Sequence, residues 1–205
     1  MSKIYYIGGS PCSGKSTLAQ IISEQYELHY FKVDDYLDEY MRRANASNKP
    51  FSSQALKRSA DETWMRDPMI QNTEELKIYR EIFEYIMEDL SKIEAPKGII
   101  TEGAAYLPEL MHEIKVNTNS YICIVPTKDF QYHHYKLRPW VPEILKACTD
   151  KEKAFDNWME RDALFAVTVK DEADKLGYRT LITDGTIGVK HMYKQVVEWF
   201  QYKTI

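Results

Sequence analysis

The feature that most constrains the fold is a glycine-rich stretch near the N-terminus. Residues 9–16 read Gly-Ser-Pro-Cys-Ser-Gly-Lys-Ser, which satisfies the pattern GxxxxGK[ST] at every fixed position. It follows a short apolar run at residues 4–7 and precedes an apolar-striped helix that begins with Thr17 and Leu18. A strand, this loop and a helix in that order form the context in which the pattern binds phosphate. The chain is therefore expected to bind a nucleotide.

The chemistry of phosphate binding explains the spacing of this motif. Glycines let the backbone curl so that successive N–H groups face one anion, and the start of the following helix adds its positive end. Lys15 is then expected to act as a catalytic residue on the β- and γ-phosphates, and the Ser16 hydroxyl to bind Mg²⁺. The expected cofactors are therefore ATP and Mg²⁺. The loop residues expected to contact them are Gly9, Pro11, Cys12, Ser13, Gly14, Lys15, Ser16 and Thr17.

Short apolar runs alternate with longer helical stretches along the chain. The predicted strands are residues 4–7, 29–33, 98–101, 121–125 and 179–183. They are mostly apolar, as expected of strands covered on both faces. Between them, apolar residues recur with the helical period, most clearly over 76–93, and also over 155–176 and 189–200. This alternation predicts a doubly wound α/β fold with a parallel sheet.

Length and composition predict one domain spanning residues 1–205. The chain is 44% hydrophobic and 28% charged, which excludes a disordered or linker-rich polypeptide. Residues 36–95 are too long for a single crossover and predict a helical insert over the sheet edge where substrates enter. With 27 Lys and Arg against 31 Asp and Glu, the net charge of −4 predicts no nucleic-acid or anionic-membrane partner.

Cysteine usage and hydropathy predict a cytoplasmic protein. Cys12, Cys123 and Cys148 are odd in number and lack CxxC spacing, so neither a disulfide framework nor a zinc site is indicated. No apolar stretch approaches the roughly 18 residues of a membrane span. The expected partner is a small-molecule acceptor, and the chain is expected to be a monomer or a homodimer.

Two aspartates follow the second predicted strand. Parallel strands place their carboxyl ends at one edge of the sheet, so Asp34 and Asp35 should lie beside the phosphate loop. A carboxylate there can accept the proton of a hydroxyl that attacks the γ-phosphate. The alternative is that an aspartate caps the next helix. We expect Asp34 at the site and Asp35 as the cap, with the reverse assignment left open.

Missing landmarks narrow the class of nucleotide-binding protein. The chain has no guanine-binding NKxD motif, and its third strand ends Thr101-Glu102-Gly103 where a GTPase would have DxxG. One small domain also argues against helicases and oligomeric motors.

The sequence resembles the small-molecule and nucleoside kinase branch of P-loop NTPases, which includes nucleoside monophosphate, shikimate, gluconate and uridine kinases and chloramphenicol phosphotransferase. The matching segments are residues 8–17, 33–36, 99–103 and 184–186, and only the first is highly specific. The resemblance implies a five-stranded parallel sheet in the order 2-3-1-4-5. It also implies that the insert at 36–95 binds the acceptor, that a lid occupies 127–161, and that residues 184–187 pass the adenine.

The resemblance also suggests roles for single residues. Asp34 matches the carboxylate that receives the acceptor hydroxyl. Glu102 falls where an acidic group approaches Mg²⁺ or the acceptor, although it could instead bond a nearby backbone N–H. Arg138 and Arg161 suit a lid whose guanidinium groups stabilise the transferring phosphoryl group. For either arginine the alternative is a solvated face or a local ion pair.

The sequence departs from the branch in its lid. Residues 129–135 lack the several arginines of adenylate kinases, which weakens the case for a monophosphate acceptor. The insert, however, holds Arg42, Arg43, Arg58 and Arg66. The residues expected to bind the acceptor are Asp34, Arg42, Trp64, Arg66 and Glu102. Trp64 could stack on an acceptor ring or simply pack the insert.

These inferences favour an ATP- and Mg²⁺-dependent kinase that phosphorylates a hydroxyl of a small molecule. A nucleoside monophosphate kinase is the alternative within the same class. A nucleotide-binding regulatory module with little catalysis is the alternative of a different class.

Overall fold

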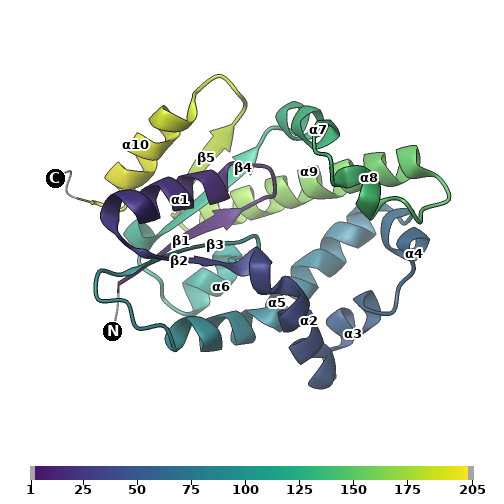
Figure 1. Ribbon diagram of the computed structural model, residues 1–205, viewed down its shortest axis with the longest axis horizontal. Coiled ribbons are helices and arrows are strands. Elements are labelled where there is room, and N and C mark those ends of the chain that lie inside the picture. Colours follow the sequence, from purple (N-terminus) through teal and green to yellow (C-terminus); the bar gives the residue numbers. More distant parts are fainter. Residues whose placement is uncertain (1–2, 203–205) are drawn as a thin grey trace.

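The computed structural model describes residues 3–202, which form an α/β fold around one sheet (Figure 1). All four strand pairs are parallel, and the order across the sheet is β2-β3-β1-β4-β5. The strands are β1 (Ile4–Gly9), β2 (His29–Lys32), β3 (Ile99–Glu102), β4 (Tyr121–Pro126) and β5 (Arg179–Thr183). The predicted fold class and strand order, those of a P-loop kinase-like fold, are thus confirmed.

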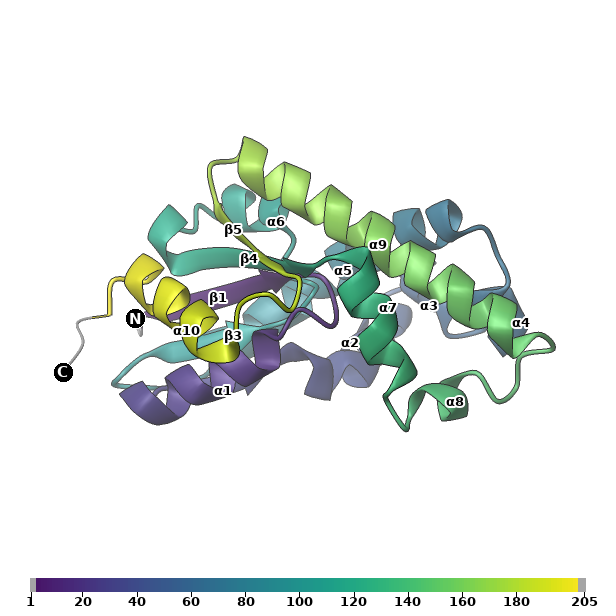
Figure 2. The same ribbon diagram turned by 90° about the horizontal axis from the view of Figure 1, so that it is seen from above.

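Helices cover both faces of the sheet. They are α1 (Lys15–Tyr26), α2 (Leu37–Ala46), α3 (Pro50–Ala55), α4 (Ala60–Trp64), α5 (Pro68–Ser91), α6 (Pro108–Glu113), α7 (Lys128–Lys136), α8 (Val141–Ile144), α9 (Lys151–Lys175) and α10 (Val189–Trp199). Figure 2 shows α1 and α10 on one side of the strands and α6 and α9 on the other. Two apolar cores follow from this layering, because side chains of successive strand residues point to opposite faces.

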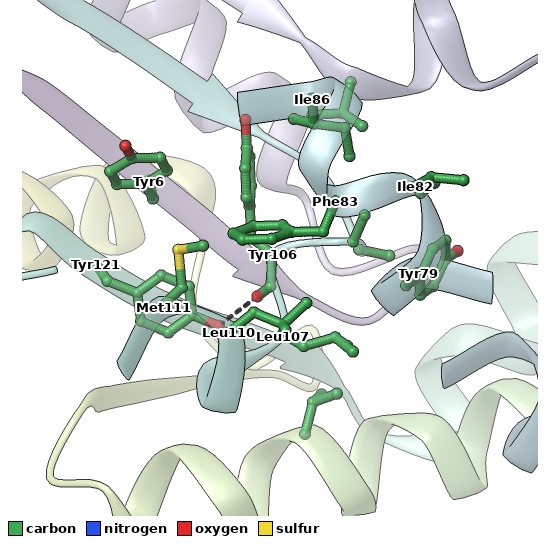
Figure 3. Packing of buried hydrophobic residues seen from close by; sticks show 14 of the residues in the cluster. Tyr6, Tyr79, Ile82, Phe83, Ile86, Tyr106, Leu107, Leu110, Met111 and Tyr121 are labelled. Atoms are coloured by element: carbon green, nitrogen blue, oxygen red, sulfur yellow. Dashed lines mark hydrogen bonds between the residues drawn. The ribbon is translucent and has the colours of Figure 1, made fainter. Parts of the chain in front are cut away.

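The larger core is rich in tyrosine (Figure 3). Tyr6 and Tyr106 pack edge to face with ring centres 5.2 Å apart. The Tyr121 hydroxyl donates to the Tyr106 carbonyl at 2.8 Å, and the Tyr106 hydroxyl lies 2.6 Å from Thr101 Oγ1. The tyrosine excess, 15 residues in the sequence, therefore partly serves packing in which the hydroxyls bond to the protein itself.

Two long helices connect the sheet to the predicted insert and lid. The insert region folds into α2, α3, α4 and the 24-residue α5, while α7 and α8 follow β4. The 25-residue α9 begins at Lys151, four residues before the predicted start, and packs along α5. Figure 2 shows α3, α4 and α8 beyond the end of the sheet, so they overhang the edge at which the strands finish.

No helix among residues 3–202 is long and apolar enough to cross a membrane. All three cysteines are free thiols.

Candidate functional site

The phosphate loop connects the end of β1 to the start of α1 as predicted. Gly9 closes β1 with a φ of 112°, and its backbone presses so closely on the backbone of Ile124 that a Cβ would collide with it. Gly14 is the N-cap of α1, with a φ of 85° and no side-chain cap bond within the described chain. The first N–H groups of α1 are therefore left without a capping side chain, which suits an anion.

Side chains hold the loop in place from several directions. Lys15 is buried, and its Nζ donates to the Ser10 carbonyl at 2.7 Å. The Ser10 hydroxyl donates to the Asp162 carbonyl of α9 at 3.3 Å, and the Thr183 hydroxyl donates to the Ser13 carbonyl at 2.8 Å. The buried Ser13 hydroxyl has no partner within residues 3–202. The loop is thus fixed by α9 and β5 while keeping polar groups unused.

Glu102 ends β3 beside the phosphate loop and is fully buried. Tyr30 donates its hydroxyl to Glu102 Oε1 at 3.1 Å, while Oε2 has no hydrogen-bond partner among the described residues. Burial raises the pKa of Glu102, and the nearby Asp34 raises it further, whereas the Lys15 charge and hydrogen bonds from Ser16 and Tyr30 lower it. Glu102 is therefore a buried carboxyl with one unused oxygen, and it lies within electrostatic range of Lys15 and Asp34.

The two aspartates after β2 lie in a short 3₁₀ helix, Val33–Tyr36. Asp34 is exposed, and Asp35 pairs with Lys32 at 3.0 Å. The expectation that Asp35 caps the next helix is wrong. The N-cap of α2 is Tyr36, which makes no side-chain cap bond in the described structure. Asp35 points to Lys32 because the 3₁₀ turn brings residues three apart together.

Arg161 lies on α9 and is held by carboxylates on both sides. Its Nε is 2.6 Å from Asp162 Oδ1, and its Nη1 is 3.1 Å from Glu75 Oε2 on α5. Its side chain is only 11% exposed. Burial by itself lowers the pKa of Arg161, but the charges of Asp162 and Glu75 outweigh burial and raise it. Arg161, expected on the lid, therefore sits on a long helix that also packs in the core.

Arg138 follows α7 and approaches the phosphate loop. Its Nη2 lies 3.5 Å from Cys12 Sγ, and its guanidinium lies over the rings of Tyr135 and Trp140. Beside it opens a cavity of about 460 Å³ between the loop, α7 and the start of α10. The lining residues include Cys12, Ser13, Gly14, Phe130, Arg138, Gly185 and Ile187. The loop and the segment expected to pass an adenine thus share one cavity.

A second cavity, of about 190 Å³, lies between the insert and α9, and we call it the arginine cavity. It is lined by Ala55, Arg58, Thr63, Trp64, Arg66, Gln71, Glu74, Glu75, Ile78 and Arg161. Two of the predicted acceptor-binding residues, Trp64 and Arg66, meet here. Arg42 does not line it, since its Nε donates to the Asp38 carbonyl on α2. Asp34 and Glu102 are not among its lining residues either.

Trp64 joins the insert to the lid region through aromatic contacts. Its ring lies 4.6 Å from that of Trp158, and Trp140 lies 5.9 Å from Trp158 on another side. The Arg161 guanidinium lies 5.5 Å from the Trp64 ring centre. Asn157 donates to the Trp64 carbonyl at 3.0 Å. Trp64 therefore packs the insert against α9 and also forms part of the cavity wall.

The sequence does not predict the carboxylates of this region as site residues. Glu74, Glu75 and Asp162 neutralise the cavity arginines, and Arg58 shares Glu74 with Arg66. The helical stripe over residues 76–93 predicts the apolar face of α5. It does not indicate which arginines the carboxylates of α5, Glu74 and Glu75, contact. Those partners come from α9 and from the loops flanking α4.

Comparisons with known proteins extend only to the fold. No protein-family profile matches the sequence, and no curated protein matches it. The crystal structure of TT1252 from Thermus thermophilus is similar over 96% of this chain and 95% of that one, with 16% identity and a TM-score of 0.51. This likeness supports the same overall fold.

Two further solved structures align more loosely. An uncharacterised protein from Eubacterium ventriosum shares 15% identity, with 98% and 99% of the two chains covered and a TM-score of 0.49. A protein from Chloroflexus aurantiacus, named only as a candidate kinase, shares 15% identity, with 96% and 97% covered and a TM-score of 0.41.

Proposed function

We propose that this chain is an ATP- and Mg²⁺-dependent kinase that transfers the γ-phosphoryl group to a hydroxyl of a small molecule. The observation that carries the proposal is the meeting of three elements at one sheet edge. The phosphate loop supplies Lys15, the end of β3 supplies the buried Glu102, and the turn after β2 supplies Asp34. Phosphate binding, metal assistance and proton removal each have a candidate group within this edge.

The described residues fit a bound nucleotide. The uncapped start of α1 and the unpartnered Ser13 hydroxyl offer donors to phosphate oxygens. Lys15 would exchange its bond with the Ser10 carbonyl for the β- and γ-phosphates. The cavity of about 460 Å³ is large enough for a nucleoside and reaches Gly185 and Ile187, where the base would lie.

The same edge fits Mg²⁺ together with the nucleotide. No group of three or more His, Cys, Asp or Glu within residues 3–202 could hold a metal unaided. A site that uses Ser16, the unused oxygen of Glu102 directly or through water, and nucleotide oxygens agrees with the preference of Mg²⁺ for few protein ligands. The bound ion would neutralise charge that builds on the β- and γ-phosphates.

Residues of the chain can assist each part of the phosphoryl transfer. The acceptor hydroxyl oxygen bonds to the γ-phosphorus while the bond between that phosphorus and the bridging oxygen of ADP breaks. Asp34 takes the hydroxyl proton, and its exposed position leaves it free to meet the acceptor. Lys15, Arg138 and Arg161 stabilise the charge on the transferring group, with Arg161 already oriented by its two carboxylates.

ATP consumption in the presence of candidate acceptors tests this proposal. We expect uncharged hydroxyl compounds to stimulate consumption by the wild-type protein, with ADP formed in equal amount to a new phosphate ester. Stimulation by nucleoside monophosphates alone would support a monophosphate kinase instead. A rise in melting temperature with ATP, but no turnover with any acceptor, would contradict the proposal and favour a regulatory nucleotide-binding module.

A further inference from the structure

The arginine cavity holds three guanidinium groups, and each of them faces a carboxylate. Arg58 Nη1 and Arg66 Nη1 lie 2.7 Å and 2.5 Å from the same atom, Glu74 Oε2. Arg161, which lines the cavity from α9, is held by Glu75 and Asp162. Positive and negative charges therefore balance within a small volume.

Glu74 is the carboxylate that two of the arginines share. Its side chain is 19% exposed, and the side chains of Arg58 and Arg66 are 16% and 26% exposed. Burial raises the pKa of Glu74, but hydrogen bonds from Arg66 and Arg58 outweigh burial and hold it below its usual range. Glu74 is therefore ionised at neutral pH, and its single negative charge is shared by two arginines.

The guanidinium groups nevertheless keep donors for a ligand. Each carries five N–H groups, and the ion pairs engage only one nitrogen of Arg58 and one of Arg66. The Arg66 Nε atom is buried and has no hydrogen-bond partner within residues 3–202. The N–H groups that the ion pairs leave unused can donate to a ligand with acceptor oxygens.

The cavity adjoins the reacting edge described above. Arg161 lines it, and the carbonyl of the next residue, Asp162, accepts the hydrogen bond from Ser10 of the phosphate loop. Burial raises the pKa of Tyr79, the nearby Glu75 and Asp34 carboxylates raise it further, and Arg161 lowers it, so Asp34 lies within electrostatic range of this part of α5. The volume of the arginine cavity, about 190 Å³, lies below the roughly 300–1,000 Å³ of ordinary ligand pockets, which favours a compact ligand.

We propose that the arginine cavity is the acceptor subsite, that it takes a small uncharged polyhydroxy compound, and that Glu74 sets this specificity by offsetting one of the two positive charges of Arg58 and Arg66, which brings the cavity as a whole to charge balance. The inference rests on the proposed function. A phosphate group would have to enter beside Glu74 and Glu75, and like charges at that distance oppose binding. Hydroxyl oxygens accept from the free N–H groups without needing a net positive charge.

Replacing Glu74 tests the inference. The probes are two matched pairs, ribose with ribose 5-phosphate and glycerol with glycerol 3-phosphate. A non-hydrolysable ATP analogue with Mg²⁺ saturates the phosphate loop, so that a probe phosphate cannot bind there. Binding is followed by tryptophan fluorescence, since Trp64 lines the cavity, and by calorimetry.

For wild type we expect tighter binding of the uncharged member of each pair. Glu74→Gln should bind the phosphorylated member at least tenfold more tightly than wild type does, with a strong salt dependence, and the uncharged member within about threefold. Glu84→Gln is the matched control, because Glu84 lies on the same helix, is exposed and pairs with Lys49 outside the cavity. Tighter wild-type binding of the phosphorylated members, or no gain in Glu74→Gln, would overturn the inference.

A second variant keeps the test decisive if Glu74→Gln fails to fold. Arg66→Gln leaves the pair of Arg58 with Glu74 and makes the cavity one unit more negative. It should weaken binding of phosphorylated probes further and improve glucosamine relative to glucose by at least threefold. Improved phosphate binding in Arg66→Gln would overturn the inference. All readouts are of binding, so they stand apart from the turnover assay on which the proposed function depends.

Discussion

The two cavities beside the phosphate loop are built in different ways. The cavity beside the phosphate loop, which we propose as the nucleotide side, uses backbone N–H groups, glycines with positive φ and polar atoms that have no partner among the described residues. The arginine cavity, which we propose as the acceptor side, uses long side chains from α5, α9 and the segments flanking α4, and their charges are already paired with one another. A site made of backbone N–H groups depends mainly on the local sequence. In a site made of ion-paired side chains, a change of one charged residue can alter which ligand binds.

Replacing Asp34 should produce the largest effect on turnover, because Asp34 is the proposed base that links the acceptor to the bound nucleotide. Asp34→Asn keeps the shape but cannot take a proton, so turnover should fall by about 10²–10⁴-fold while ATP affinity stays within a few-fold. Asp35→Asn is the matched control, because Asp35 pairs with Lys32 on the surface and its loss should change turnover less than about threefold. Steady-state kinetics and calorimetry measure both. The reverse ranking of the two variants would assign the base to Asp35.

Removing the charge of Arg161 tests how much its ion pairs stabilise the folded protein. Arg161→Met leaves the buried Asp162 and the half-buried Glu75 without their shared partner, which should cost about 3–5 kcal/mol of unfolding free energy. Arg138→Met should cost only about 0.5–1 kcal/mol, because Arg138 is half-buried and mainly lies over aromatic rings. Denaturant unfolding measures both. Equal losses would mean that the paired network around Arg161 contributes no more than the contacts on the nucleotide side.

The smallest effect concerns the pH dependence of Glu102. Burial raises the pKa of Glu102, and the hydrogen bond from Tyr30 partly opposes that shift. Tyr30→Phe should therefore raise the pKa further and move the acid limb of kcat/KM upward by about 0.5–1 pH unit. The unfolding free energy should also depend on pH. A carboxyl whose folded pKa is raised loses stabilisation as the pH rises from its ordinary value to the folded value, so Tyr30→Phe should lose more stability than wild type over that window.

A pH–rate profile and a pH series of unfolding measure these two effects. Tyr132→Phe serves as control, since its hydroxyl meets Asp156 on the surface. An acid limb that stays in place in Tyr30→Phe would remove Glu102 from the ionisations that control turnover.

The sequence predicts the fold and the position of the phosphate loop between β1 and α1 well because their signals are local. Apolar runs, helical period and the glycine pattern depend on neighbouring residues, and the strand order follows from the resemblance built on them. Strand β3 ends at Glu102, one residue beyond the predicted range of 98–101, and a fully buried carboxylate at that position is unusual.

The acceptor side is less predictable because its partners are far apart in the sequence. Glu74 meets Arg58 and Arg66 only after the insert folds back, and Arg161 meets Glu75 across two helices. Whether an arginine binds a ligand or a neighbouring carboxylate is decided by those contacts. Asp35 shows the same limit at short range, because a helix cap and a 3₁₀ ion pair compete for one side chain.

Transfer of label from γ-labelled ATP tests the central claim most directly. The wild-type protein is incubated with Mg²⁺, labelled ATP and a pool of small hydroxyl compounds, and the products are separated into ATP, inorganic phosphate and organic phosphate esters. Lys97→Ala, in which a surface ion pair with Glu27 is lost, serves as control for Lys15→Ala. We predict label in an organic ester with wild type and the control, and at least a 10²-fold loss with Lys15→Ala. Label that stays in ATP, or appears only as inorganic phosphate, would contradict the account.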